Sequence, residues 1–224
     1  MNMKETNVRK RLLDAFREII IIIGTVSVLV MVIMIYMAGD YNKVLNNYAF
    51  PQGDIGRAMN ATAEIRSATR AVIGYEEQWL KDVVKEQHET AVKEFEYYRE
   101  QIRPTMVTSE GEACMKEIDQ AWDAYIKVDK EIVTLGATTD QIKCKQAQEK
   151  MIQELAPLYD KLDEAMKKLM DVNVEKGYAS QTKLETLEMI IVVMLVIAIT
   201  TVISRSMKVA GTIAKEIEDI LNLP

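Results

Sequence analysis

Two arginines one helical turn apart carry the clearest potential for binding chemistry in this sequence. Arg66 and Arg70 lie in the stretch EIRSATRAVIGY beside apolar residues, and Thr62 and Thr69 place hydroxyl groups near them. A guanidinium keeps its proton at physiological pH, so a partly buried arginine needs an anion. That anion is either an Asp or Glu side chain of a neighbouring helix or second subunit, or a small carboxylate ligand gripped by the arginines. The residues leave both alternatives open, and they make Arg66, Arg70, Thr62 and Thr69 the predicted ligand-binding residues.

The remaining reactive side chains argue against an enzyme. His88 is the sole histidine, so neither a His-containing catalytic triad nor a two-histidine metal site can form. The nine glycines are scattered, without the spacing of a phosphate-binding loop. Adjacent carboxylates such as Glu76 and Glu77 are typical of solvated charge on polar helix faces rather than of an acid and base pair. The sequence therefore predicts no catalysis, no metal site and no cofactor.

The two cysteines, Cys114 and Cys144, both fall on predicted core faces of helices. If the chain folds back near Ala137, their distances from the turn differ by about 24 Å along the helix axis. This separation excludes a disulfide within one chain. Small core side chains and a disulfide across a dimer remain as the alternatives.

Two long apolar runs predict membrane-spanning helices. Residues 19–38 contain no charged side chain, and as a helix they cover about 30 Å, the thickness of a hydrocarbon core. The second run, 188–203, is shorter and crosses with slight local thinning of the bilayer. A cleavable signal peptide is the alternative for the first run, but its apolar core is too long and no small-residue cleavage pattern follows it.

Basic residues set the predicted orientation of both spans. Lysines and arginines cluster before the first run and after the second, which favours a two-pass protein with both termini in the cytoplasm. The expected organisation is a cytoplasmic tail at 1–18, a span at 19–38, an extracytoplasmic domain at 39–187, a second span at 188–203 and a cytoplasmic helix at 204–224. The outer segment 39–186 carries 20 Lys and Arg against 27 Asp and Glu, a net charge of −7. Such an acidic domain argues against nucleic acid or an anionic membrane surface as its partner.

The outer segment has the pattern of an all-α, antiparallel, up-down-up-down four-helix bundle. Helix formers dominate this segment, and its glycines and prolines predict the turns. The first predicted helix ends at about Tyr75, and the next two cover about 77–103 and 109–135. The fourth runs from about Thr139 into the second span. Residues 49–54 around Pro51 are either extended or helical with staggered helix ends. Pro157 predicts a kink, not a break, in the fourth helix.

Each predicted helix carries an apolar seam with spacings of three and four residues. The expected core residues are Ala58, Ala61, Ile65, Ala68, Val72 and Tyr75; Leu80, Val84, Gln87, Ala91, Phe95, Tyr98 and Ile102; Cys114, Ile118, Ala121, Tyr125, Val128, Ile132 and Leu135; and Cys144, Gln148, Met151, Leu155, Leu158, Leu162, Ala165 and Leu169. The first helix has a second seam, consisting of Met59, Thr62, Arg66, Thr69 and Ile73. A helix with two faces to bury predicts a symmetric contact with the same helix of another subunit.

The segment after the second span has one apolar face, formed by Met207, Ala210, Ala214, Ile217 and Leu221. It predicts an amphipathic helix that continues the span and carries displacement to a partner helix. A tail lying on the inner leaflet is the alternative, although its mixed charge does not favour it.

This layout resembles the sensory half of methyl-accepting chemotaxis receptors of the four-helix-bundle type. The segments AWDAYIKVDKEIVTLG and ELAPLYDKLDEAMKKLMDVNVEKGYAS are similar to later helices of that family, and SRSMKVAGTIAKEIEDIL is similar to the first helix of a HAMP relay, without its expected proline near Ala210. The resemblance implies a homodimer in the bacterial inner (plasma) membrane, attractant binding through first-helix arginines, here Arg66 and Arg70, and a piston-like shift of the fourth helix. Because the 224 residues stop within the HAMP-like helix, we expect kinase coupling to need further segments.

The resulting functional prediction is a chemotaxis-type receptor module that senses a small, anionic extracellular ligand, a carboxylate or an amino acid. Its partners are then this ligand, the lipid bilayer and a second copy of the chain. Two alternatives have the same layout: the sensor region of a histidine kinase or cyclic-dinucleotide enzyme, and a stand-alone membrane-anchored helical interaction protein.

Overall fold

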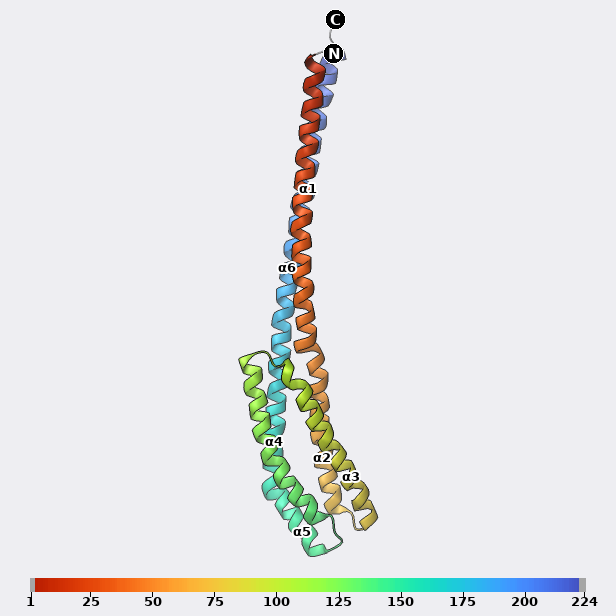
Figure 1. Cartoon of the computed structure of the whole chain (residues 1–224), viewed down its shortest axis with the longest axis vertical. Coiled ribbons are helices and arrows are strands. Elements are labelled where there is room, and N and C mark those ends of the chain that lie inside the picture. Colours follow the sequence, from red (N-terminus) through yellow and green to blue (C-terminus); the bar gives the residue numbers. More distant parts are fainter. Residues whose placement is uncertain (1–2, 222–224) are drawn as a thin grey trace. The chain divides into compact units, whose positions relative to one another are not determined.

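The protein is all-α, as predicted, in a computed structural model that describes residues 3–221 and, among them, the side chains of 10–215, 217 and 218. Within residues 3–221 no strand occurs. The helical elements in chain order, shown in Figure 1, are α1 Met3–Val44, η1 Leu45–Ala49, α2 Phe50–Gly74, α3 Gln78–Ile102, η2 Arg103–Thr105, α4 Ser109–Gly136, α5 Gln141–Lys150, η3 Met151–Leu155 and α6 Ala156–Leu221. The chain divides into two compact units, residues 42–180 and the two chain ends that flank them.

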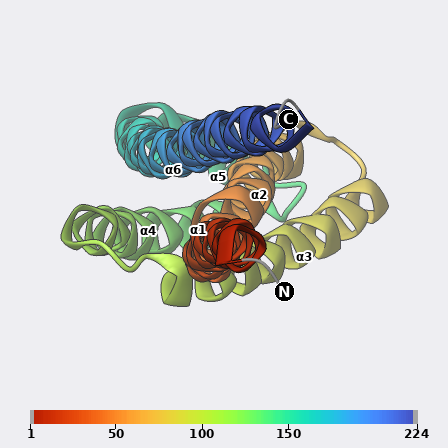
Figure 2. The same ribbon diagram turned by 90° about the horizontal axis from the view of Figure 1, so that it is seen from above.

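Residues 42–180 form the antiparallel four-helix bundle. Helix α2 packs against α3, α4 and α5, and the first part of α6 packs against α4, where the rings of Tyr125 and Tyr159 are 6.2 Å apart. Figure 2 shows these helices end on. The α2–α3 and α4–α5 turns lie together at one end of the bundle, which we call the turn end. The η2 turn contacts η1 at the opposite end.

The helix ends follow the predicted turn signals. Gly74 and Gly136 end α2 and α4, and Pro104 lies in the short η2 turn after α3. The Thr108 hydroxyl accepts a hydrogen bond from the backbone N–H of Gly111 at 3.1 Å and thereby caps α4. Asp140 caps α5 in the same way, with its carboxylate 2.9 Å from the N–H of Ile142. These caps satisfy backbone donors that a helix start leaves without a partner.

Both prolines inside long helices follow a π-helical turn. The turn η1 comes just before Phe50 and Pro51, and η3 comes just before Ala156 and Pro157. An extended segment at 49–54 is therefore wrong, because these residues stay helical. A wider turn before a proline lets the chain remain helical although the proline ring lacks the N–H and crowds the preceding turn. The fourth helix likewise continues through Pro157 without a break, and the predicted kink there stays a prediction.

The core agrees with most of the predicted seams and corrects four positions. Tyr75 is 42% exposed and lies outside the core. On α3 the buried face holds Lys81 and His88 in place of Leu80 and Gln87. On α5 Ala147 is buried and Gln148 is exposed. On α3 the predicted seam lies one residue too early at Leu80 and Gln87, because a pattern of apolar residues does not include a lysine or a histidine that is buried. The largest fully buried side chains are Trp122, Tyr125, Lys81, Phe95, Ile55, Ile65, Ile102, Ile118, Ile132, Leu162, Met166 and Leu169.

The buried ammonium of Lys81 joins the helices at the turn end. It donates hydrogen bonds to the carbonyl of Val72 on α2 at 2.7 Å and to that of Gly136 on α4 at 2.9 Å. Its nitrogen also lies 3.5 Å from the sulfur of Cys144 on α5. Carbonyls in the last turn of a helix carry partial negative charge and have no partner within the helix, so a cation stabilises them.

A second polar group, formed by Thr69, His88 and Asp129, crosses the bundle core. The carboxylate of Asp129 is 0% exposed. One of its oxygens accepts from the Thr69 hydroxyl at 2.6 Å, and the other lies 2.5 Å from Nε2 of His88. Helices α2, α3 and α4 are thus tied together by hydrogen bonds that the desolvated carboxylate requires.

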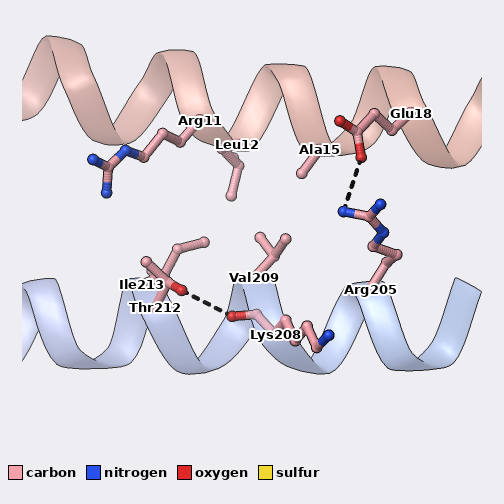
Figure 3. Close-up of a pocket in the computed structure, with 9 residues that line it drawn as sticks. All are labelled: Arg11, Leu12, Ala15, Glu18, Arg205, Lys208, Val209, Thr212 and Ile213. Carbon is pink, nitrogen blue, oxygen red and sulfur yellow. Dashed lines mark hydrogen bonds and ion pairs between the residues drawn. The ribbon is translucent and has the colours of Figure 1, made fainter.

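Residues 3–41 and 181–221 form a pair of antiparallel helical segments. Glu18 of α1 and Arg205 of α6 lie 3.4 Å apart (Figure 3). Each segment is long and apolar enough to cross a membrane, and neither apolar window is buried inside the structure. Side chains such as Ile35 and Ile197 are 68% and 60% exposed. Long, exposed apolar surfaces are typical of lipid-facing helices, not of core helices in soluble proteins.

Substitution of Gly136 by alanine is expected to destabilise the bundle. A Cβ there would lie 2.9 Å from Cγ1 and 3.4 Å from Cα of Ile73, so α2 and α4 would have to move apart. Gly56, also helical, has nothing within 4 Å of such a Cβ. We expect Gly136→Ala to lower the free energy of unfolding by about 1 kcal/mol and Gly56→Ala to raise it by about 0.5–1 kcal/mol. Thermal unfolding of the full chain in detergent, followed by circular dichroism, measures both; equal shifts would contradict the close approach.

Removal of the Asp129 carboxylate is expected to cost more. In Asp129→Ala the buried His88 loses its carboxylate partner, whereas the Thr69 hydroxyl keeps the Ile65 carbonyl, 2.9 Å away, as an acceptor, and the substitution should cost about 3 kcal/mol. Asp123→Ala is the matched control, because Asp123 is exposed on the same helix and should change stability by less than about 0.5 kcal/mol. The same melting experiment compares them, and an unchanged midpoint in Asp129→Ala would show that the buried hydrogen bonds add no stability.

Candidate functional site

The first predicted site residue, Arg66 on α2, lies against an aromatic ring. Its guanidinium carbon is 4.1 Å from the ring centroid of Tyr159 on α6. Among the described residues, neither Arg66 nor Arg70 forms an ion pair or a side-chain hydrogen bond. Within one chain, the face of Tyr159 therefore takes the place of the expected Asp or Glu partner of Arg66. A cation over an aromatic face is attracted by the negative charge of the ring face.

The Arg66–Tyr159 contact ends a row of aromatic side chains that crosses the bundle core. Phe95 on α3 and Trp122 on α4 have centroids 4.1 Å apart, and Trp122 stacks on Tyr125 at 6.0 Å. Tyr125 then meets Tyr159 on α6 at 6.2 Å. All four arms of the bundle contribute to this row, because Arg66 closes it from α2. Tyr159 of α6 is thus linked through ring contacts to α4 and α3 and through Arg66 to α2.

Tyr125 provides a buried hydroxyl within this row. Its side chain is 0% exposed, and its hydroxyl has no hydrogen-bond partner among the described residues. Burial raises the pKa of Tyr125 well above its usual range, and the nearby Asp129 carboxylate adds to this effect. Arg66 and Arg70 act in the opposite direction. The hydroxyl thus stays neutral and keeps its proton at physiological pH.

The second arginine, Arg70, lines a cleft of about 600 Å³ at the turn end. The walls come from the end of α2, the α4–α5 turn and α5. Its size falls within the range that suits a small organic ligand. The lining residues are Arg70, Ile73, Gly74, Tyr75, Glu76, Lys81, Thr138, Thr139, Gln141, Cys144, Lys145, Gln148 and Met151.

This cleft is positively charged although the domain around it is acidic. Arg70, Lys81 and Lys145 line it, and among the described lining residues Glu76 alone is acidic. The surrounding segment 39–186 has 20 basic and 27 acidic residues. A cleft whose charge is opposite to that of its domain concentrates anions from solution. Hydroxyls of Thr138 and Thr139 and the amide of Gln141 add neutral hydrogen-bonding groups to the cleft.

The structure places the other two predicted site residues elsewhere. Thr62 and Thr69 are 2% and 1% exposed, inside the core of a single chain. The Thr62 hydroxyl donates to the carbonyl of Met59 at 2.7 Å, and that of Thr69 donates to Asp129. Neither residue lines the cleft beside Arg70. Their part in ligand binding stays a prediction, and the second seam of the first helix is, at these two residues, core of the same chain.

Sequence reasoning missed Lys81 and Lys145 as neighbours of Arg70. Lys145 lies beside Cys144, which was assigned to a core seam, and nothing in the sequence joins it to a residue 75 positions earlier. Lys81 offered a signal, because it lies three residues before Val84 on the buried face of α3. A lysine at a seam position predicts a buried cation that needs carbonyl or carboxylate partners.

The described residues show no arrangement suited to metal-dependent chemistry. Within this part of the chain, no group of three or more His, Cys, Asp or Glu side chains could hold a metal ion. Cys114 is buried in the core and Cys144 is half-buried, and both are free thiols. Burial raises the pKa of the Cys114 thiol, which keeps it protonated.

Comparison with known proteins agrees with this organisation. No curated protein matches the chain significantly. A family described as a four helix bundle sensory module for signal transduction matches residues 2–187, which are most of the 224 residues. The match includes the first apolar run and the whole bundle. The chain therefore belongs to the family of four-helix-bundle sensory modules that act in signal transduction.

Proposed function

We propose that this chain is the sensory part of a transmembrane receptor that binds a small anionic ligand and passes a helix displacement across the membrane. The observation that carries the proposal is the basic cleft at the turn end of an acidic bundle. Arg70 of α2 and Lys145 of α5 both line this cleft. We propose regulation of chemotaxis as the output of this receptor, on the basis of the family resemblance. This output requires segments beyond the HAMP-like helix.

The cleft chemistry favours a carboxylate or an amino acid as the ligand. The planar fork of Arg70 can hold a carboxylate by two parallel hydrogen bonds, and Lys145 adds a second positive charge. Glu76, in the same lining, can accept hydrogen bonds from an ammonium group. A zwitterionic amino acid would thus find a partner for each of its charges.

Helix continuity supports a mechanical link between the cleft and the second apolar run. The chain is helical without interruption from Gln141 to Leu221, through α5, η3 and α6. Met151 lines the cleft and is also the first residue of the π-helical turn η3. A π-helical turn accommodates an extra residue, so its conversion to α-helix moves the following helix by about 1.5 Å. Ligand binding at the cleft could select one of these two states.

The proposed receptor crosses the membrane twice and has both termini in the cytoplasm of a bacterial cell. Two exposed apolar helices and the distribution of basic residues support this topology. The proposal also includes a homodimer. Arg66 remains partly exposed beside the exposed Arg70, so a second copy could contact the same face of α2.

Ligand binding should depend on Arg70 and Lys145. A panel of organic acids and amino acids, added to the full chain in detergent, should contain a compound that raises the thermal unfolding midpoint, because binding to the native state alone stabilises it. For that compound, Arg70→Ala and Lys145→Ala should each weaken binding by about tenfold or more. Arg66→Ala tests the adjacent arginine in the same titration.

Lys85→Ala is the matched control for these variants, since Lys85 is an exposed lysine on α3 outside the cleft lining. It should leave the affinity unchanged. A compound that stabilises wild type, Arg70→Ala and Lys145→Ala to the same extent would remove the cleft as the ligand site. If every compound fails, the interaction-protein alternative gains support.

The topology is testable separately by thiol labelling of intact cells. The background carries Cys114→Ala and Cys144→Ala. A membrane-impermeant maleimide should label Lys85→Cys, in the bundle, while the cells are intact. It should label Ser204→Cys only after the cells are lysed. Both positions are exposed, so access to the thiol depends on the side of the membrane. The reverse pattern would place the bundle inside the cell.

A further inference from the structure

We propose that Asn173 on α6 is a positioning residue that connects this helix to the π-helical turn η1. Its side-chain nitrogen donates a hydrogen bond to the backbone carbonyl of Asn47 at 3.2 Å, across 126 positions of the sequence. Asn47 lies within η1, the turn that joins α1 to α2 at the end of the bundle opposite the turn end. The inference rests on the proposed function for its consequence, because α6 is the helix that we propose to move.

Pro51 explains why the Asn47 carbonyl takes a donor from another helix. In a regular α-helix the carbonyl of residue 47 accepts a hydrogen bond from the N–H of residue 51. Residue 51 is a proline, which has no N–H and whose ring crowds that carbonyl. Pro51 is buried and Asn47 is half-buried, so solvent has limited access to this carbonyl. The amide of Asn173 thus takes the place of the missing backbone donor.

The burial of Asn173 indicates that its position requires a hydrogen-bond donor. The side chain is 3% exposed, and its oxygen Oδ1 has no hydrogen-bond partner among the described residues. Leu169, one turn earlier on the same helix, is fully buried in the apolar core. A leucine at 173 would fill a similar volume and leave no buried acceptor without a partner. The bond from the nitrogen to Asn47 is the interaction that accounts for an asparagine here.

Gly177 allows α6 and η1 to lie close together. A Cβ at Gly177 would lie 3.4 Å from Cβ of Tyr48 and 3.8 Å from Nε2 of Gln52. Gly177 is one turn after Asn173, and Tyr48 directly follows Asn47. The glycine therefore brings the two backbones near enough for the short asparagine side chain to reach a main-chain carbonyl.

This hydrogen bond couples the conformation of η1 to the position of α6. Its length of 3.2 Å is at the long end of the range for an N–H donor and an oxygen acceptor. A shift of α6 by about 1–2 Å, the scale of a helix displacement in a switching protein, would break it. The Asn47 carbonyl would then lose its donor, and η1 would be free to open. A displacement of α6 would thus reach the first apolar run through η1 as well as the second run directly.

Amide hydrogen exchange of the full chain in detergent, measured by mass spectrometry without added ligand, tests this inference. Asn173→Leu keeps the side-chain volume and removes the donor. Peptides that cover residues 45–55 should then exchange roughly tenfold faster, because η1 opens locally. The rest of the bundle should keep its wild-type exchange rates. Asn60→Leu is the matched control, since it removes an exposed asparagine from α2 and should leave the exchange of 45–55 unchanged.

A second variant separates the missing donor from a general loss of packing. Pro51→Ala restores a backbone N–H at residue 51, so Asn173→Leu in that background should no longer speed the exchange of 45–55. Unchanged exchange in Asn173→Leu, equal acceleration throughout the bundle, or the same acceleration in the Pro51→Ala background would overturn the proposal. Because no ligand is added, failure of this connection and failure of the ligand cleft are distinguishable.

Discussion

The bundle depends on the burial of one charged group, the ammonium of Lys81. This side chain is 1% exposed and donates to carbonyls at the ends of α2 and α4 while lying 3.5 Å from the Cys144 sulfur on α5. A buried cation must keep such partners, because each lost hydrogen bond leaves a desolvated charge. The helix ends that surround the ligand cleft are thereby held at fixed positions. Lys81 also lines that cleft, so one residue both organises the turn end and contributes to its positive charge.

The candidate ligand cleft and the aromatic row share one helix, α2. Arg70 and Arg66 lie one turn apart on α2, but the first lines the cleft and the second stacks on Tyr159 of α6. From Tyr159 the aromatic row continues through Tyr125 into α4. In the proposed function, an anion drawn to Arg70 would therefore act close to a cation that contacts α6. The π-helical turn η3 follows α5 directly, and its first residue, Met151, also lines the cleft.

Much of this architecture follows from the sequence, and the parts that do not have physical reasons. Ala58, Ile65 and Val72 were predicted as core because apolar residues at helical spacing lie on one face of the helix, which is then buried. Gly74 and Gly136 marked helix ends because glycine is a local helix breaker. Burial of His88 and Lys81 depends on partners 41 and 55 residues away, which periodicity does not reveal. Arg70 was predicted as a ligand-binding residue, which stays a prediction, and its neighbour in the cleft, Lys145, was not predicted, since their proximity is a property of the folded bundle. The π-helical turns, too, were not predicted, although both precede a proline.

The central claim is that an anion in the cleft moves the helix that continues from α5 into α6. Its most direct test is the distance between two spin labels at the end of the bundle opposite the turn end. At that end α4 and α6 are joined by the ion pair of Glu110 and Lys176, whose charged atoms are 2.6 Å apart. Labels at the exposed residues Ala113 and Ala179, in a background without native cysteines, report this distance by pulsed electron paramagnetic resonance. A stabilising compound at saturation should shift the distance by about 1–2 Å, and Arg70→Ala should abolish the shift. An unchanged distance distribution in the fully liganded wild-type bundle would contradict the account.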